Sequence, residues 1–216
     1  MPLAAKNVAL VVTSTRGARV GPSVASLVAT VLQPSAKAAN ISLKTVDLKS
    51  FNLPVYSEWM PPKMVSPGGP QFEQETSKAW ADEMSSHDGY IFILNEYNYS
   101  MSGAAKNAID YLMNGFTGKP VAIISYGIQG GNLANDHAQG VLSKMGLTVI
   151  EPRPTLGFFG GRGPEGILAV TEGKLGDETR KDWSEGHRAE ILEAFEKLGE
   201  QLRVVPKPEG DQLPPN

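Results

Sequence analysis

Three short segments of the chain carry the side chains and glycines that could bind a ligand. The first is TSTRGARVGPS at residues 13–23, which offers four hydroxyl groups and two arginines before an apolar pattern of helical spacing. The second is NEYNYSMS at residues 95–102, in which two tyrosines and two asparagines follow an apolar run. The third is SYGIQGG at residues 125–131, which contains three glycines. Each follows a predicted strand and precedes a predicted helix, so all three are expected at strand ends.

The first segment suits a single phosphate group. Backbone N–H groups and the dipole at a helix start favour an anion, and Arg16 and Arg19 would add charge-assisted hydrogen bonds. The segment lacks both the GxxxxGK(S/T) and the GxGxxG patterns, which disfavours ATP and a dinucleotide held in the Rossmann manner. The alternative is an ordinary turn in which Ser23 caps the helix and both arginines are solvated.

The other two segments suit a flat ring. Tyr97 and Tyr99 could stack on its face, while Asn95 and Asn98 could hydrogen-bond to its edges. The glycines of the third segment would let the backbone approach such a ring closely. Taken singly, the segments are also explained by tyrosines packed on a neighbour or by a tight turn. Together, the three predict a site for a planar heterocycle that carries one phosphate, a description that FMN satisfies.

Predicted strands and helices alternate five times along the chain. The strands are expected at 8–12, 41–46, 90–94, 121–125 and 147–150, and the helices at 24–33, 72–84, 103–113, 133–145 and 182–203. This alternation predicts an α/β fold with one parallel sheet and helices on both faces. Right-handed crossovers and five strands favour the doubly wound, flavodoxin-like strand order 2-1-3-4-5. The three segments would then meet at one edge of the sheet, where open α/β sheets bind ligands.

Two long stretches have no clear period. Residues 47–71 form a predicted loop with Tyr56 and Trp59, of a length that is often functional or interfacial. Residues 157–174 are glycine-rich and expected to be irregular. We expect one flavodoxin-like domain over 1–203 and a proline-rich, disordered tail over 204–216.

The composition narrows the functional classes. The formal net charge is −3 with no long basic block, which argues against a nucleic-acid partner. The chain has no cysteine, so disulfides, thiolate metal sites and a cysteine nucleophile are excluded. The three histidines are scattered, and no metal site is predicted. No apolar run approaches the ~18 residues of a membrane span, and a cytoplasmic location is expected.

Three stretches resemble the NAD(P)H-dependent FMN reductase family of flavodoxin-like proteins, in particular its fungal quinone and flavin reductase branch. They are STRGARVGPSVA, EYNYSMSGAAKNAIDYL and KPVAIISYGIQGG, which span roughly residues 8–146. The resemblance implies bound FMN, hydride from NADH or NADPH, and a small acceptor such as a quinone, free flavin, an azo compound or a metal ion. It also implies a homodimer or tetramer. Asn95 and Gln129 depart from the residues usual in the family, which puts the choice of acceptor in doubt.

The resemblance also assigns the cofactor site by motif. The residues expected to bind FMN are Ser14, Arg16, Arg19, Val20, Gly21 and Pro22 around the phosphate, Glu96, Tyr97, Asn98 and Tyr99 along the ring, and Ser125, Tyr126, Gly127, Gly130 and Gly131 at its pyrimidine side. No catalytic side chain is predicted, because the flavin carries the chemistry. The alternatives are an FMN-binding electron carrier and a redox-dependent regulatory or scaffold protein. The near-neutral charge is unlike the acidic docking surface of a carrier.

Overall fold

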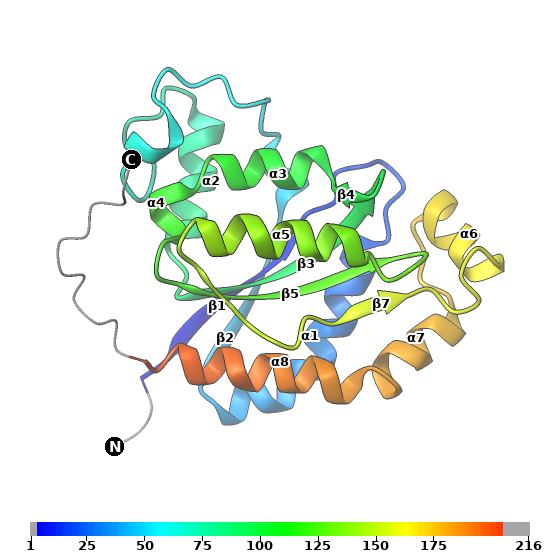
Figure 1. Cartoon of the computed structure of the whole chain (residues 1–216). Coiled ribbons are helices and arrows are strands. Elements are labelled where there is room, and N and C mark those ends of the chain that lie inside the picture. Colours follow the sequence, from blue (N-terminus) through cyan, green and yellow to red (C-terminus); the bar gives the residue numbers. More distant parts are fainter. Residues whose placement is uncertain (1–3, 205–216) are drawn as a thin grey trace.

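A seven-stranded sheet separates two layers of helices in the computed structural model, which describes residues 4–204 (Figure 1). The strands are β1 (Lys6–Val12), β2 (Ile41–Asp47), β3 (Gly89–Tyr97), β4 (Ser100–Met101), β5 (Pro120–Gly127), β6 (Thr148–Val149) and β7 (Thr155–Gly157). The helices are α1 (Gly21–Ala38), α2 (Glu75–Ser85), α3 (Gly103–Asp110), α4 (Met113–Phe116), α5 (Asn132–Lys144), α6 (Pro164–Glu172), α7 (Asp177–Glu185) and α8 (Arg188–Gln201), with 3-10 turns η1 (Leu48–Phe51) and η2 (Pro62–Met64).

The main strands run parallel in the order β2-β1-β3-β5-β6, which confirms the predicted doubly wound arrangement. The structure has seven strands rather than the five expected. The fifth position is divided between β6 and β7, both paired with β5, because Pro152 and Pro154 between them cannot donate to a ladder. The other addition is β4, which pairs antiparallel with an extension of β3.

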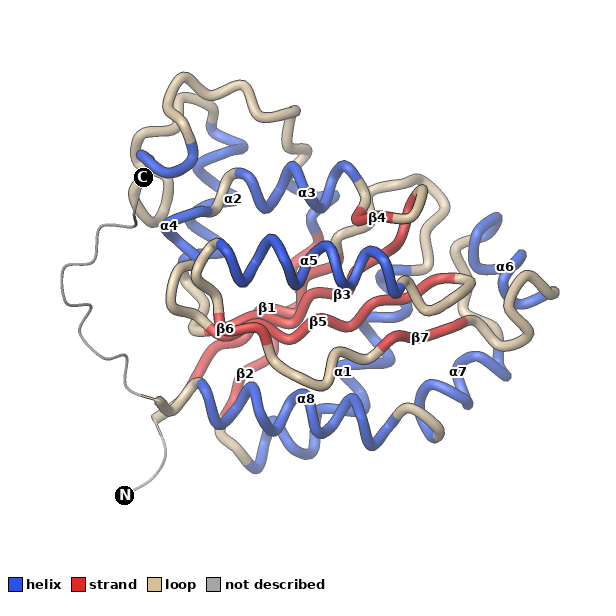
Figure 2. The backbone as a smooth tube through the Cα atoms, viewed as in Figure 1, coloured by secondary structure: helices blue, strands red, loops and turns tan. Residues whose placement is uncertain are grey.

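The two faces of the sheet are buried in separate cores. Along β1, Val8, Leu10 and Val12 join the core under α1 and α8, while Ala9 and Val11 join the core under the α2–α5 layer. Figure 2 shows the strands lying between these layers. Successive strand residues point to opposite faces, so a strand covered on both sides is continuously apolar. This is the pattern from which the strands were predicted.

Several predicted element boundaries are wrong. Helix α1 continues through Pro34 to Ala38, because Leu32 and Ala36 are both buried and their packing outweighs the missing N–H of the proline. The single helix expected over 182–203 is two helices, α7 and α8, which meet at Gly186 and His187.

The other differences concern the buried face of α5 and the structure of residues 157–174. The sequence places Leu133, His137, Val141 and Met145 on one side of this helix, but the buried residues of α5 are Ala134, Asn135, Ala138 and Leu142, and Leu133 is 44% exposed. The region 157–174, predicted to be irregular, contains α6.

The long loop between β2 and α2 is anchored to α3. Asn107 accepts from the Tyr56 N–H at 2.9 Å and donates to the Pro54 carbonyl at 2.7 Å. The Tyr56 ring also packs against Tyr111, with centroids 4.7 Å apart. Trp59, by contrast, is 80% exposed.

None of the helices in the described part of the chain has the length and apolar character of a membrane span. Within residues 4–204, no three His, Cys, Asp or Glu side chains gather at a possible metal site. Apart from Val204, the predicted tail lies outside the described residues, and the predicted domain boundary stays a prediction.

Candidate cofactor site

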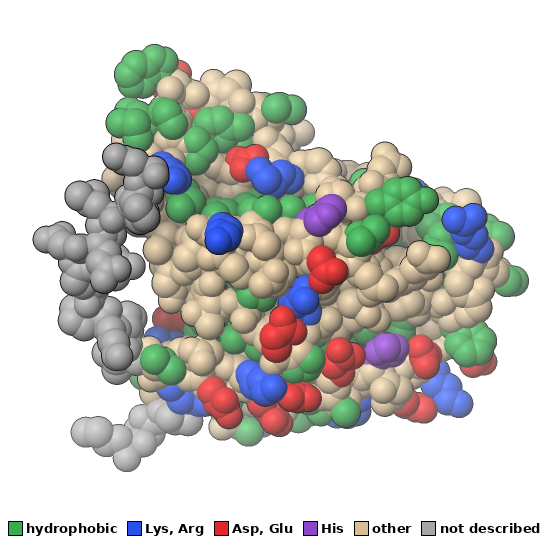
Figure 3. Space-filling model, viewed as in Figure 1, with side chains coloured by type: hydrophobic (Ala, Val, Ile, Leu, Met, Phe, Trp, Pro, Cys, Tyr) green, Lys and Arg blue, Asp and Glu red, His purple; other side chains and the backbone are tan. Residues whose placement is uncertain are grey.

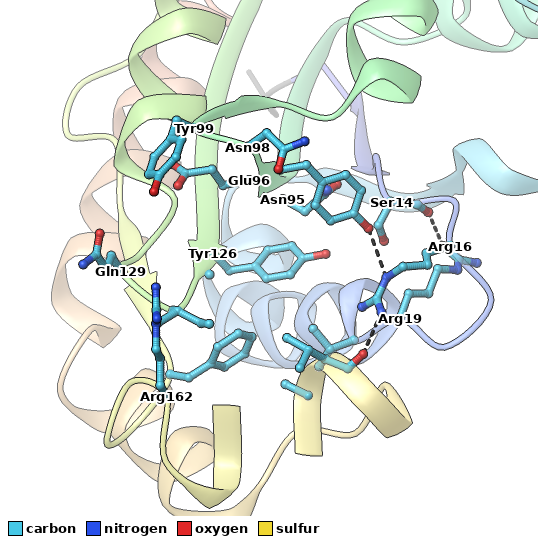
Figure 4. A pocket seen from close by; sticks show the side chains of 17 residues that line it. Ser14, Arg16, Arg19, Asn95, Glu96, Asn98, Tyr99, Tyr126, Gln129 and Arg162 are labelled. Atoms are coloured by element: carbon cyan, nitrogen blue, oxygen red, sulfur yellow. Dashed lines mark hydrogen bonds between the residues drawn. The ribbon is translucent and has the colours of Figure 1, made fainter. Parts of the chain in front are cut away.

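The three predicted segments meet around one cavity of about 550 Å³ at the carboxyl ends of β1, β3 and β5 (Figure 4). The cavity is lined by Ser14, Arg16, Arg19, Val20, Asn95, Glu96, Tyr97, Asn98, Tyr99, Tyr126, Gly127, Ile128, Gln129, Phe158, Arg162, Ala169 and Val170. Ten of the residues predicted from the motifs are therefore brought together. The other five, namely Gly21, Pro22, Ser125, Gly130 and Gly131, do not line the cavity.

The loop after β1 presents a buried hydroxyl and a helix start. Ser14 is 1% exposed, and its Oγ makes no well-formed hydrogen bond among residues 4–204, although it lies close enough to the Tyr126 hydroxyl to offset part of the rise that burial causes in the pKa of that phenol. Helix α1 begins at Gly21 after Val20, whose apolar side chain cannot cap the first N–H groups, so the alternative of a Ser23 cap is wrong. Gly21 lies directly against the loop, since a Cβ on it would sit 2.3 Å from Ser14 Oγ. This end of the cavity offers hydrogen-bond donors that the described protein does not satisfy.

The two arginines of this loop differ in their partners. The Arg19 guanidinium forms a bidentate ion pair with Asp47, in which Nη1 lies 2.9 Å from Oδ1. The same Nη1 donates to the Ser14 carbonyl at 2.7 Å. The charge of Arg19 is therefore balanced and its side chain braces the loop. A direct contact between Arg19 and a phosphate stays a prediction.

Arg16, in contrast, has no acidic partner in the part of the chain that the structure describes. Its Nε donates to the Tyr97 hydroxyl at 3.2 Å, and its Nη1 donates to the Val170 carbonyl at 2.6 Å (Figure 4). Neither partner is a carboxylate, so the positive charge of Arg16 is available to an anion in the cavity.

The second segment forms a β-hairpin instead of the predicted loop. Strand β3 runs on to Tyr97, and the turn to β4 places Asn98 and Tyr99 at φ 49° and 64°. Two consecutive left-handed residues are typical of a type I′ hairpin turn. Tyr99 is 73% exposed beside the cavity, whereas Asn95 is buried and its Nδ2 lacks a partner among the described residues.

The Glu96 carboxylate is hydrogen-bonded to the first turn of helix α5. Its Oε2 accepts hydrogen bonds from the N–H groups of Leu133 and Ala134, at 3.0 and 3.2 Å, in the first turn of α5. A carboxylate is stabilised there by the free N–H groups and the helix dipole. This geometry supports a positioning role for Glu96 rather than the role of an acid near the ring.

The third segment contributes less than predicted. Ser125 turns away from the cavity, because its Oγ donates to the Gly130 carbonyl at 2.8 Å and accepts from Asn135 at 3.0 Å. Gly130 and Gly131 have φ of 80° and 75°. A Cβ on Gly131 would lie 3.0 Å from the Tyr126 carbonyl oxygen. These glycines are therefore required by the turn itself and not by a close approach to a ligand.

Tyr126 lies across the middle of the cavity, with its hydroxyl directed towards the end that holds Ser14 and Arg16 (Figure 4). Burial raises the pKa of Tyr126 to about 12. The phenol is therefore protonated at working pH and can donate a hydrogen bond.

A fourth wall of the cavity was not predicted. Phe158, Arg162, Ala169 and Val170 come from β7 onward and from α6, in the region expected to be irregular. Gly163–Pro164 followed by an apolar run is a helix-start signal that could have revealed α6. Nothing in the sequence around α6 indicates that this helix covers the cavity.

The chemistry of the cavity fits FMN. Two buried groups, Ser14 Oγ and Asn95 Nδ2, make no well-formed hydrogen bond among the described residues, although such groups are normally satisfied. The uncompensated Arg16 adds a positive charge at the same end as Ser14 (Figure 4). Tyr126 and Tyr99 supply aromatic surface for a flat ring. An anionic tail and a planar ring with polar edges would satisfy this set of groups.

Comparison with known proteins agrees with this geometry. A family described as NADPH-dependent FMN reductase matches residues 6–159, more than half of the chain. The chain belongs to the NADPH-dependent FMN reductase family. As a member of this family of FMN reductases it is an oxidoreductase. The match contains the three cavity loops and ends before α6.

Relatives and solved structures extend the comparison. The chain is 41% identical over 198 residues to the NAD(P)H-dependent FMN reductase ntnL of a Nectria species, covering 91% of this chain and 97% of that protein. It is 32% identical to the NAD(P)H-dependent FMN reductase LOT6 of Saccharomyces cerevisiae, covering 67% and 77% of the two chains. The fold resembles that of the NAD(P)H:acceptor oxidoreductase FerB of Paracoccus denitrificans, with a TM-score of 0.61 at 23% identity and coverage of 89% and 98%.

Proposed function

We propose that the protein uses bound FMN to transfer electrons from NADH or NADPH to a small acceptor, such as a quinone, free flavin, an azo compound or a metal ion. The observation that carries the proposal is that two buried groups, Ser14 Oγ and Asn95 Nδ2, make no well-formed hydrogen bond among the described residues and line the same cavity as Arg16, which has no acidic partner there. The chain is also 31% identical over 149 residues to the quinone reductase of Pseudomonas putida, which supports this class of acceptor.

The residues at one end of the cavity would hold the phosphate of FMN. Ser14 Oγ, the first N–H groups of α1 and the Arg16 guanidinium would donate to it, while Arg19 and Asp47 brace the loop. To reach the phosphate, Arg16 would exchange its hydrogen bond to the neutral Val170 carbonyl for one to an anion, which is a stronger interaction.

The residues in the middle of the cavity would orient the ring. The Asn95 amide would bond to a ring edge, the protonated Tyr126 hydroxyl would donate, and the Gly127 backbone allows close approach. FMN, when bound, supplies the hydride and electron transfer chemistry. Phe158 and Val170 form an apolar wall that would keep water away from one side of the ring. The two substrates are proposed to use the same open face in turn, which predicts ping-pong kinetics.

The test is an anaerobic absorbance spectrum of the purified protein before and after addition of NADPH. A yellow protein that bleaches supports the proposal, and a yellow protein that stays yellow would instead indicate an electron carrier or a regulator. A colourless protein that takes up no added FMN would refute the cavity as an FMN site. Arg16→Ala is expected to weaken FMN binding by ~10-fold or more. The matched control Arg188→Ala removes a charge from the start of α8, outside the cavity, and should have no effect.

The proposal includes a homodimer or tetramer. An apolar groove of about 850 Å³ runs along α5, with Pro62 and Met113 on one side and Val141 and Met145 on the other. Figure 3 shows hydrophobic side chains gathered between α5 and the helices above it. A second copy that covers this groove would remove apolar surface from water. Light scattering should give a mass of at least two chains, and Val141→Glu should lower it. The cytoplasmic location stays a prediction.

A further inference from the structure

The third arginine of the cavity, Arg162, has no partner among the described residues. Arg162 lines the cavity, yet its side chain makes no hydrogen bond and no ion pair with any residue in the described range 4–204. The other two cavity arginines are both engaged, Arg19 with Asp47 and Arg16 with Tyr97 and Val170. Arg162 is exposed to solvent, and its guanidinium can donate hydrogen bonds to a ligand in the cavity.

Arg162 lies at the opposite end of the cavity from the proposed phosphate site. In Figure 4, Arg162 and Gln129 lie together at one end, whereas Ser14, Arg16 and Arg19 lie at the other. Tyr126 lies between the two ends. A phosphate at the Ser14 end is thus separated from Arg162 by the part of the cavity that the ring would fill. An anion at Arg162 would belong to a second ligand.

The turn that carries Arg162 is held in place on both sides. Phe158 is buried and stacks on Trp183 with centroids 5.5 Å apart, and the Phe159 N–H donates to Thr179 Oγ1 at 3.0 Å. Within the turn, the Gly161 N–H donates to the Phe158 carbonyl at 2.8 Å and the Gly163 N–H to the Gly160 carbonyl at 3.0 Å. The backbone position of Arg162 is therefore set by the packing of β7, α6 and α7.

The carboxylates closest to Arg162 in the sequence and in the cavity are occupied elsewhere. Glu165 accepts from the N–H groups of Glu178 and Thr179 at 2.9 and 2.6 Å, at the start of α7. Glu96 is bonded to the first turn of α5. No carboxylate among the described residues neutralises the Arg162 guanidinium, so an anionic ligand group is its natural partner.

We propose that Arg162 binds a phosphate of the nicotinamide dinucleotide, either the 2′-phosphate or the pyrophosphate. The inference rests on the proposed function, because that function supplies a second, phosphate-bearing ligand that must enter the same cavity. The flat guanidinium fork matches two phosphate oxygens, and the Gln129 amide at the same end of the cavity adds a donor (Figure 4). Arg162 lies beyond residue 159, where the family match ends, so this recognition belongs to the α6 region of this chain.

The test measures binding without turnover. FMN-loaded protein is titrated calorimetrically with NADP⁺ and with NAD⁺, neither of which can donate hydride. Arg162→Ala should weaken NADP⁺ binding by roughly 10-fold, the loss expected for one charge-assisted contact at an exposed site. A loss confined to NADP⁺ assigns Arg162 to the 2′-phosphate, and an equal loss for NAD⁺ assigns it to the pyrophosphate. Arg162→Lys, which keeps the charge but not the fork, should show an intermediate loss.

Three further measurements control the result. Arg180→Ala removes one positive charge from α7, outside the cavity, and should leave both affinities unchanged. FMN affinity should be the same in Arg162→Ala and wild type. In steady-state assays, Arg162→Ala should raise KM for NADPH and leave KM for uncharged benzoquinone unchanged.

The proposal is overturned if Arg162→Ala binds NADP⁺ and NAD⁺ as wild type does, or if its defect lies in FMN affinity or in the benzoquinone KM alone. Failure of the proposed function gives a different result, since wild-type protein would then stay yellow with NADPH whatever the effect of Arg162→Ala on NADP⁺ binding. A wild-type protein that binds neither dinucleotide would overturn both.

Discussion

Replacing Gly21 with alanine should damage the phosphate end of the cavity through a contact that can be measured. The added Cβ would lie 2.3 Å from Ser14 Oγ, 2.9 Å from the Tyr126 hydroxyl oxygen and 3.1 Å from Val12 Cγ1. The first distance is more than 1 Å below the ~3.5 Å at which non-bonded atoms rest, so Ser14 or the start of α1 must move. Gly17→Ala is the matched control, because a Cβ there meets nothing within 4 Å.

The size of the effect follows from two opposing terms. Overpacking a buried site costs ~1–3 kcal/mol, and removing a glycine from a helix returns ~0.5–1 kcal/mol. We therefore expect Gly21→Ala to lower the free energy of unfolding by ~1–2 kcal/mol, and Gly17→Ala to change it by less than ~0.5 kcal/mol. If Ser14 Oγ donates to the FMN phosphate, its displacement should also weaken FMN binding by ~10-fold.

Urea denaturation of the apoprotein and fluorescence titration with FMN measure the two effects separately. A Ser14→Ala background removes the closest contact, so adding Gly21→Ala to it should cost ~0.5–1 kcal/mol less than in wild type. The reasoning is refuted if Gly21→Ala and Gly17→Ala have equal unfolding free energies and equal FMN affinities. An equal cost of Gly21→Ala in both backgrounds would show that Ser14 is not the group displaced.

Three other substitutions test separate parts of the site and fold. Tyr99→Gly should raise the unfolding free energy by about 1 kcal/mol, because a φ of 64° strains any side chain. The same substitution should raise the KM for the acceptor, and an unchanged KM would show that Tyr99 does not contact the ring. Glu96→Gln should lower the free energy of unfolding by ~1 kcal/mol, because it weakens the hydrogen bonds at the start of α5. Urea denaturation measures this loss, and titration with FMN should show an unchanged affinity. Burial acts to raise the pKa of Asp88, but the Asn7 N–H and the Lys6 ammonium hold it below its usual value. That stabilisation is present above the unfolded-state pKa of ~3.9 and is lost as pH falls through the lower folded-state pKa. Asp88→Asn should therefore be less stable than wild type at pH 7, and a gap that persisted at pH 2 would contradict the assignment.

The arrangement of the sheet was predictable because its signal is local. Strands such as Val8–Val12 are buried on both faces, so every residue in them is apolar and the run is visible in the sequence. The alternation of strand and helix then leaves few topologies. The prediction ended helix α1 before Pro34, although the helix continues to Ala38. The residues after Pro34 are held in the helix by packing against other parts of the fold, which the local sequence does not show.

Only some of the residues that line the cavity were predictable from the sequence. Residue types and their place after strands identified the loops that hold Ser14, Asn95 and Tyr126. Ser14 and Ser125 look equivalent in the sequence, but Ser125 is bonded to Gly130 and Asn135, whereas Ser14 makes no well-formed hydrogen bond in the described chain. The difference depends on what packs around each hydroxyl.

The sequence by itself determined that an α/β sheet brings three ligand-binding loops to one edge, because strand burial and loop order are properties of short stretches. The tertiary structure decided which groups in those loops are free to bind. Arg19 is neutralised by Asp47, 28 residues away, and Arg16 reaches Val170, 154 residues away. Arg162 joins the cavity only because the segment from β7 to α6 packs against it. Hydrogen bonds act over about 3 Å of space whatever the separation along the chain, so the partners of a side chain are fixed only once the whole chain has packed.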